Sequence, residues 1–202
     1  MNKTDLLVIG GSAGGILTAT MARKAYGDKI SITVIRQTKT VMVPCGIPYI
    51  YGTLHDVKKN VISDAVLNNA NINLVIDTVL KIDREQKMVT TEKNGDFSYK
   101  KLVIATGSLP IVPTFIPGYD LENVFTIKKD EEYLSNISRQ LESAQNVAVI
   151  GGGFIGIEFA EQISLLGKKV TLIEVADACL WQAFDKEYTD DLESLLSNHG
   201  IR

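Results

Sequence analysis

The sequence predicts an α/β fold, because the order strand, glycine-rich loop, helix, strand occurs twice along its 202 residues. The first copy spans about residues 5–35 and the second about 147–174. Strands joined through a crossover helix run parallel to each other. We therefore expect two domains of this kind, at 1–112 and at 113–202, the second one partial because the sequence supplies only two of its strands.

The elements of the first copy follow from local patterns. An apolar strand at 5–9 runs into glycines, and a helix then continues to about Tyr26, where Gly27 is a typical stop. The β-branched stretch at 30–35 predicts a buried strand. A helix is expected at 56–70 and a short strand at 72–76.

The stretch between the two copies has a different pattern, with short β-forming segments separated by turn residues. Asn94-Gly95 between β-forming segments predicts a hairpin. We expect an antiparallel meander of three strands, at 78–83, 87–92 and 97–101. A separate buried strand at 102–105, a proline-rich linker at 108–120 and a polar helix at 129–143 follow, and a last helix is expected at 186–198.

The second glycine loop has the stronger motif. Gly151-Gly152-Gly153-Phe154-Ile155-Gly156 matches G-x-G-x-x-G between a strand and a helix, the context of a Rossmann-like dinucleotide site. The glycines permit the tight turn and the approach of a pyrophosphate, and the helix N-terminus stabilises its charge. A carboxylate at Glu174, at the end of the next strand, can accept the ribose hydroxyls of NADH and would repel the extra phosphate of NADPH. The alternative is a glycine-rich turn of an unrelated α/β domain.

The first loop is less regular but still predicts a dinucleotide. Its residues are Gly10, Gly11, Ser12, Ala13, Gly14 and Gly15, with serine in place of the middle glycine. The acid expected after the second strand is missing, and Arg36 stands near that place. Arginine could stack on adenine or hold a phosphate, and it could equally be a plain surface residue.

Cys45 is the candidate redox residue. It lies between Pro44 and Pro48, where the chain is expected to turn into a helix whose dipole would lower the pKa of the thiol. The alternative is a small buried residue, which is the interpretation we prefer for Cys179.

Composition excludes several classes of function. A net charge of −3 offers no basic surface for nucleic acid, and no apolar run is long enough for a membrane helix or a signal peptide. Two cysteines and two histidines make no metal-binding pattern. We therefore expect a cytoplasmic protein without a metal, a nucleic-acid partner or a membrane anchor.

In combination, the paired glycine loops, Cys45-Gly-Ile-Pro-Tyr, the meander and Ala105-Thr106-Gly107 resemble the pyridine nucleotide–disulfide oxidoreductases. The resemblance implies FAD in the first domain, with Val79 near the adenine and Ala105, Thr106 and Gly107 closing over the cofactor. It implies NADH in the second domain, with Phe154 as a gate over the flavin and Glu158 near the nicotinamide.

Two positions narrow the resemblance to the single-cysteine branch of coenzyme A disulfide reductases and NADH oxidases. Ile50 stands where classical members have a second cysteine, and Ala13 stands where peroxidases and oxidases have a histidine. The resemblance thus implies electron transfer from NADH through FAD to a small disulfide or persulfide at Cys45, with coenzyme A as a possible thiol. The alternatives are an NADH oxidase that reduces oxygen and a nucleotide-binding or electron-transfer module without a substrate. The resemblance further implies that the chain is a fragment and that the full-length protein is a homodimer.

Overall fold

The computed structural model describes residues 2–202 and divides them into two compact units. The first unit contains the chain up to Pro44 and residues 61–112, and the second contains residues 45–60 and 113–202. The chain passes from the first unit to the second for the last time after Val112. Residues 45–60, which lie within the expected domain 1–112, group by their contacts with residues 113–202.

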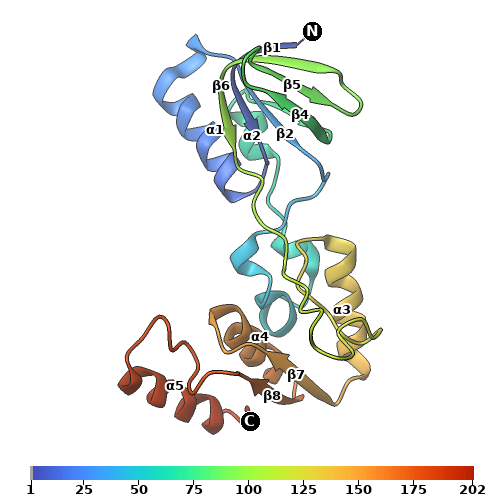
Figure 1. Cartoon of the computed structure of the whole chain (residues 1–202), viewed down its shortest axis with the longest axis vertical. Coiled ribbons are helices and arrows are strands. Elements are labelled where there is room, and N and C mark those ends of the chain that lie inside the picture. The colour runs from blue at the N-terminus through green and yellow to red at the C-terminus, as the bar shows by residue number, and fades with distance from the viewer. Residues whose placement is uncertain (1) are drawn as a thin grey trace. The chain divides into compact units, whose positions relative to one another are not determined.

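The first unit is built on a six-stranded sheet of order β3-β2-β1-β6-β5-β4 (Figure 1). Strands β1, β2, β3 and β6 are mutually parallel, whereas β5 is antiparallel to both of its neighbours. Its elements are β1 Asn2–Ile9, α1 Ala13–Tyr26, β2 Ile32–Arg36, α2 Ala65–Asn69, β3 Asn73–Ile76, β4 Val79–Asp83, β5 Met88–Thr91 and β6 Asp96–Ile104. The predicted parallel βαβ unit and the predicted meander are both confirmed.

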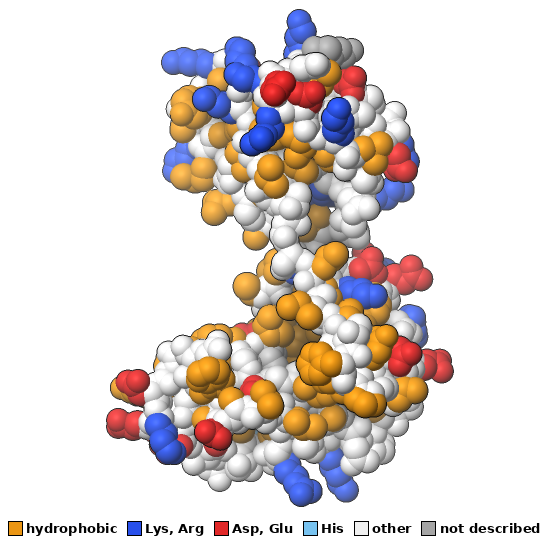
Figure 2. All heavy atoms as spheres, viewed as in Figure 1, with side chains coloured by type: hydrophobic (Ala, Val, Ile, Leu, Met, Phe, Trp, Pro, Cys, Tyr) orange, Lys and Arg blue, Asp and Glu red, His pale blue; other side chains and the backbone are white. Residues whose placement is uncertain are grey.

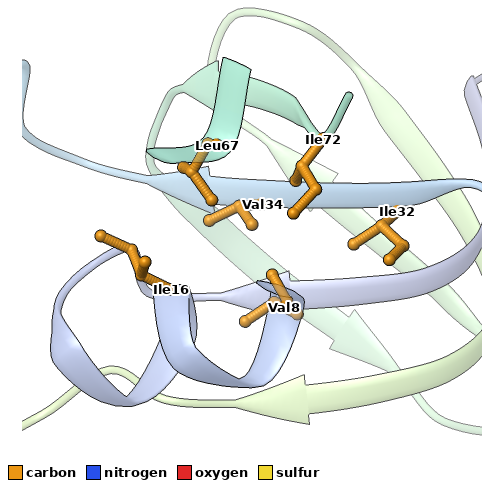
Figure 3. Close-up of a cluster of buried hydrophobic side chains, with 7 residues drawn as sticks. Val8, Ile16, Ile32, Val34, Leu67 and Ile72 are labelled. Atoms are coloured by element: carbon orange, nitrogen blue, oxygen red, sulfur yellow. The ribbon is translucent and has the colours of Figure 1, made fainter. Parts of the chain in front are cut away.

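Both faces of the parallel strands are covered. On one face, Val8 and Val34 pack against Ile16 of α1 and Leu67 of α2, as Figure 3 shows. On the other face, residues of β1 and β2 form a second apolar cluster with residues of β5 and β6. Its buried members are Leu7, Ile9, Ile35, Val89 and Phe97. Burial on both faces is why β1 and β2 read as nearly continuous apolar runs instead of alternating ones.

Strand β6 corrects one expectation. Residues 97–101 and 102–105 were predicted as separate strands, yet Asp96–Ile104 forms a single strand. It pairs in parallel with β1 from Asn2 to Ile9 and also carries β5 on its opposite edge. The meander and the parallel strands therefore share β6 and form one continuous sheet.

The helix predicted at 56–70 is wrong. The structure has a 3₁₀ turn at Val57–Asn60 and a short helix α2 at Ala65–Asn69. Between them, Val61 forms a β-bridge with Met42, and the Ile62 N–H donates to the Val41 carbonyl over 2.7 Å. This pairing with a distant segment overrides the local helical pattern.

Asp77 holds the meander together. Its carboxylate accepts backbone N–H groups of Thr78 at 2.7 Å, Lys93 at 3.1 Å and Asn94 at 2.8 Å, and the Asn94 side-chain amide at 2.7 Å. Burial works to raise the pKa of Asp77, but the hydrogen bonds from Asn94, Thr91 and Thr78 outweigh it and hold the pKa well below its ordinary value.

We expect Asp77→Asn to lower the melting temperature at pH 7, because the amide replaces an acceptor that is charged in the fold. A depressed folded-state pKa stabilises the protein above the unfolded pKa of about 4, and this contribution is lost as pH falls from there. The gap between wild type and variant should therefore narrow below about pH 4. Circular dichroism melts from pH 7 to pH 3 measure it, with the exposed Glu85→Gln as a control for lost charge. A gap that stays constant with pH would contradict the assignment.

The second unit contains a two-stranded parallel sheet of β7 and β8. Its regular elements are a π-helical turn at Ile50–Leu54, α3 Glu131–Ser143, β7 Asn146–Ile150, α4 Phe154–Ser164, β8 Lys169–Ile173 and α5 Lys186–Asn198. The predicted helix at 186–198 and the second strand–loop–helix–strand unit are confirmed. Apolar side chains gather on the face of this unit turned to the viewer in Figure 2.

No helix among residues 2–202 has both the length and the apolar character needed to cross a membrane. Within the same residues, no three His, Cys, Asp or Glu side chains come together as a metal site.

Candidate nucleotide and thiol sites

The first glycine loop is fixed by contacts with three strands. Gly10 has φ +108°, and its N–H donates to the Ile35 carbonyl over 2.8 Å. A Cβ at Gly10 would lie 2.0 Å from the Ala105 carbonyl oxygen, and a Cβ at Gly15 would lie 1.8 Å from the Gly10 carbonyl oxygen. Only glycine fits at these two positions, because the turn from β1 into α1 leaves no space for a Cβ atom there.

The second loop repeats this geometry. Gly151 also has φ +108°, and its N–H donates to the Ile173 carbonyl over 2.8 Å. A Cβ at Gly156 would lie 1.8 Å from the Gly151 carbonyl oxygen. The two glycine loops therefore have the same φ at their first glycine and the same close contact at their last one.

Both loop helices leave their N-terminal N–H groups open. The cap residue of α1, Ser12, makes no side-chain capping bond, and the cap of α4 is Gly153, which has no side chain. Neither helix has an acid in its first turn. Helix α3 of the same chain differs, because Asp130 caps it by accepting the Tyr133 N–H at 2.8 Å. The open ends of α1 and α4, with empty space beside Gly14 and Gly153, fit the pyrophosphate of a dinucleotide.

Other predicted residues of the first site lie beside its loop. The Ala105 N–H donates to the Ile9 carbonyl over 2.7 Å, and Gly107 has φ +72°. Val79 and Thr106 line one surface hollow together with Ile9 and Ile104. The structure therefore brings the ends of β1, β4 and β6 together at the edge where the glycine loop lies.

Arg36 is not a surface residue, so that alternative is wrong. Its side chain is 4% exposed and passes under Gly11, where a Cβ would lie 2.7 Å from the Arg36 Cδ. Its guanidinium donates to both carboxylate oxygens of Asp64, at 2.6 and 2.8 Å, and to the carbonyls of Thr38 and Lys39. Sequence reasoning missed Asp64, because no local pattern links the residue that precedes α2 to Arg36 at the end of β2.

Glu174 lies at the equivalent place in the second site. Its carboxylate accepts the N–H groups of Gly152 at 2.6 Å, Val175 at 2.7 Å and Ala176 at 2.9 Å. These hydrogen bonds, led by that of Ala176, lower the pKa of Glu174. The side chain is therefore charged at neutral pH and held against the glycine loop.

The remaining predicted residues of this site lie on α4. The side chains of Phe154 and Ile155 are exposed in its first turn, and the Phe154 ring lies 6.0 Å from that of Phe184, edge to face. Glu158 is half-buried one turn further along.

The Cys45 thiol is exposed, in a 3₁₀ turn at Pro44–Gly46. The helix predicted after it is present only as the short π-helical turn Ile50–Leu54, which begins five residues beyond the cysteine. Pro44 and Pro48 lack the N–H groups that a continuous helix would use. Cys179, in contrast, is buried, and burial raises the pKa of its thiol.

The thiol segment, residues 45–60, packs against α4. A Cβ at Gly52 would lie 2.3 Å from the Gln162 carbonyl oxygen, and the Thr53 hydroxyl donates to Gln162 Oε1 over 2.7 Å. The Tyr51 ring lies 5.7 Å from that of Phe159. Burial raises the pKa of the Tyr51 hydroxyl, which finds no hydrogen-bond partner within residues 2–202. Residues 51–53 of the thiol segment are thus anchored to the helix that begins at the second glycine loop.

Comparisons with known proteins agree with this geometry. Residues 4–202 match the family described as pyridine nucleotide-disulphide oxidoreductase. The chain is 35% identical to a NAD(P)H coenzyme A polysulfide/persulfide reductase of Pyrococcus horikoshii, with 98% of this chain and 45% of that protein covered. It is 32% identical to an NADH oxidase of Streptococcus pneumoniae, with 98% and 48% covered. The chain spans about half the length of these curated relatives.

Among solved structures, a NAD-dependent persulfide reductase from A. fulgidus superposes with a TM-score of 0.86 at 34% identity. The match covers 98% of this chain and 39% of that one.

Proposed function

Because the chain belongs to the pyridine nucleotide-disulphide oxidoreductases, we propose that it works in an FAD-dependent enzyme that passes electrons from NADH to a disulfide or persulfide at Cys45. The observation that carries the proposal is the pair of equivalent glycine loops, each opening onto an uncapped helix. One loop is assigned to FAD and the other to NADH, in the order of the chain.

The residues of each site fit their cofactor. Around the first loop, Gly10, Gly11 and Gly15 keep the backbone free of side chains, and the N–H groups of α1 face the pyrophosphate. Ala105, Thr106 and Gly107 close this site, and Val79 meets the adenine. FAD supplies the two-electron relay between nicotinamide and sulfur.

At the second site, the N–H groups of α4 hold the pyrophosphate of NADH, and Glu174 accepts the ribose hydroxyls. By the family resemblance, Phe154 would serve as the gate over the flavin and Glu158 as the carboxylate near the nicotinamide. The Cys45 thiolate would attack the substrate disulfide, forming a mixed disulfide and releasing one half of the substrate as a thiolate. Two electrons and a proton would then break the mixed disulfide, releasing the other half as a thiol and returning Cys45 to the thiolate.

The relatives support two acceptors, since one is named for coenzyme A polysulfide or persulfide and another as an NADH oxidase. Ala13, in place of an acid–base side chain, favours sulfur over oxygen. We further propose that the protein is cytoplasmic, where an exposed thiol stays reduced, and that it acts as a homodimer.

An absorption spectrum tests the cofactor. The purified full-length protein should show the bands of oxidised flavin, and anaerobic NADH should bleach them. Release of coenzyme A thiol from its disulfide, measured against oxygen uptake, then separates the two acceptors. A protein that stays colourless after incubation with FAD would refute the proposal.

We expect Glu174→Gln to weaken NADH binding about tenfold, because it removes a charge-assisted acceptor of the ribose hydroxyls. Removal of the same charge should improve binding of NADPH, so that the preference for NADH falls. Fluorescence titration with both nucleotides measures the two affinities. The matched control is Glu161→Gln, which removes an exposed charge on α4 and should change neither affinity. An unaltered ratio of the two affinities in Glu174→Gln would contradict the role of Glu174.

A further inference from the structure

The two nucleotide units differ at one equivalent position. Arg36 ends β2 and Glu174 follows β8, and each side chain lies against the second residue of its own glycine loop, Gly11 or Gly152. A Cβ at Gly11 would lie 2.7 Å from Arg36 Cδ, and a Cβ at Gly152 would lie 3.1 Å from Glu174 Oε2. The second site thus presents an acceptor where the first presents a donor.

Arginine alone cannot bind the ribose of an adenosine in the way Glu174 does. Its guanidinium has five N–H donors and no acceptor, whereas a carboxylate can accept both hydroxyls of the ribose. The Arg36 donors are moreover engaged, with hydrogen bonds to Asp64, Thr38 and Lys39. What the buried arginine does offer is a fixed place for a carboxylate, because it grips both oxygens of Asp64.

Asp64 meets the requirements of a ribose-binding group. Its side chain is 39% exposed, so the carboxylate is open to a ligand while Arg36 beneath it is buried. A carboxylate has about four acceptor positions, and Arg36 occupies two of them. The bidentate pairing also fixes the orientation of the carboxylate.

We propose that Asp64, held by Arg36, is the carboxylate that binds the adenosine ribose hydroxyls of the dinucleotide in the first site. The proposal rests on the assignment of FAD to this site. The sequence left open a direct contact of Arg36 with adenine or a phosphate. In the proposal Arg36 acts instead through Asp64, 28 positions further along the chain.

The test compares FAD with an analogue that lacks the 2′-hydroxyl of the adenosine ribose, with the dissociation constants measured by flavin fluorescence. In wild type, loss of this hydroxyl should weaken binding about tenfold, the scale of one hydrogen bond to a charged group. In Asp64→Asn, FAD itself should bind about tenfold more weakly, and the analogue should bind almost as well as FAD. Equal penalties for the missing hydroxyl in wild type and in the variant would overturn the proposal.

Two further variants guard against a folding defect, because Asp64→Asn leaves a buried arginine without its charge partner. Arg36→Glu combined with Asp64→Asn places a carboxylate where Glu174 lies in the second site and should restore both FAD affinity and the penalty for the missing hydroxyl. A folded double variant that binds FAD no better than Asp64→Asn would overturn the proposal. Asp28→Asn removes an exposed carboxylate that pairs with Arg23, and this variant should bind FAD like wild type. Failure of the wild-type protein itself to bind FAD would instead refute the proposed function.

Discussion

Cys45→Ser will abolish turnover of disulfides by the full-length protein and leave reduction of its flavin by NADH intact. The serine hydroxyl can neither form a mixed disulfide nor be released from one as a thiolate. We expect a loss of roughly 10³-fold or more, the scale on which removal of a covalent nucleophile acts. Anaerobic stopped-flow absorbance measures flavin reduction, and thiol release measures turnover.

Cys179→Ala is the matched control, because it removes the other free thiol of the chain. That thiol is buried, and burial raises its pKa, so it is a poor nucleophile and its loss should leave turnover close to wild type. Disulfide turnover at the wild-type rate in Cys45→Ser would refute the role of Cys45. Oxygen uptake that survives in Cys45→Ser would show that any oxygen reduction does not use this thiol.

Gly15→Ala will destabilise the first unit and prevent FAD from binding. The added methyl group would lie 1.8 Å from the Gly10 carbonyl oxygen, and neither partner can move without shifting β1 or α1. Forced overpacking of this kind costs about 3 kcal/mol, which is a large part of the stability of a small domain. Urea denaturation followed by circular dichroism measures the loss, and flavin fluorescence measures FAD binding.

Gly14→Ala provides the control, one residue earlier in the same loop. A Cβ at Gly14 has no neighbour within 4 Å, and the residue lies in the first turn of α1. The free energy of unfolding should stay the same or rise by up to about 1 kcal/mol, since alanine favours the helix. Equal destabilisation by the two substitutions would show that the close approach of Gly15 to Gly10 is not what fixes the loop.

Much of the fold was predictable because it is encoded locally. The glycine loops, the alternation of strands and helices and the Asn94-Gly95 hairpin each depend on residues close in sequence, and all three are present. The helix α5 appears at Lys186–Asn198, the range its pattern predicts.

The features that were missed depend on distant partners. Pairing of Val61 with Met42 breaks the helix expected at 56–70. Asp64 gains a role only because the fold brings it to Arg36, and the packing of Gly52 on Gln162 joins positions more than a hundred residues apart. The spacing of residues along the sequence does not indicate which distant residues will pair, so these contacts are visible only in the folded structure.

The contact between Gly52 and Gln162 sets a rule for building chimaeras within the family. Consider a chimaera that joins two parent sequences only after Val112. Its residues 45–60 would come from one parent and the α4 that they pack against from the other. Tyr51, Gly52 and Thr53 would then meet side chains that were never selected to fit them. Swapping residues 45–60 together with 113–202 keeps the thiol and its supporting helix from one parent, and is the design that should yield folded hybrids.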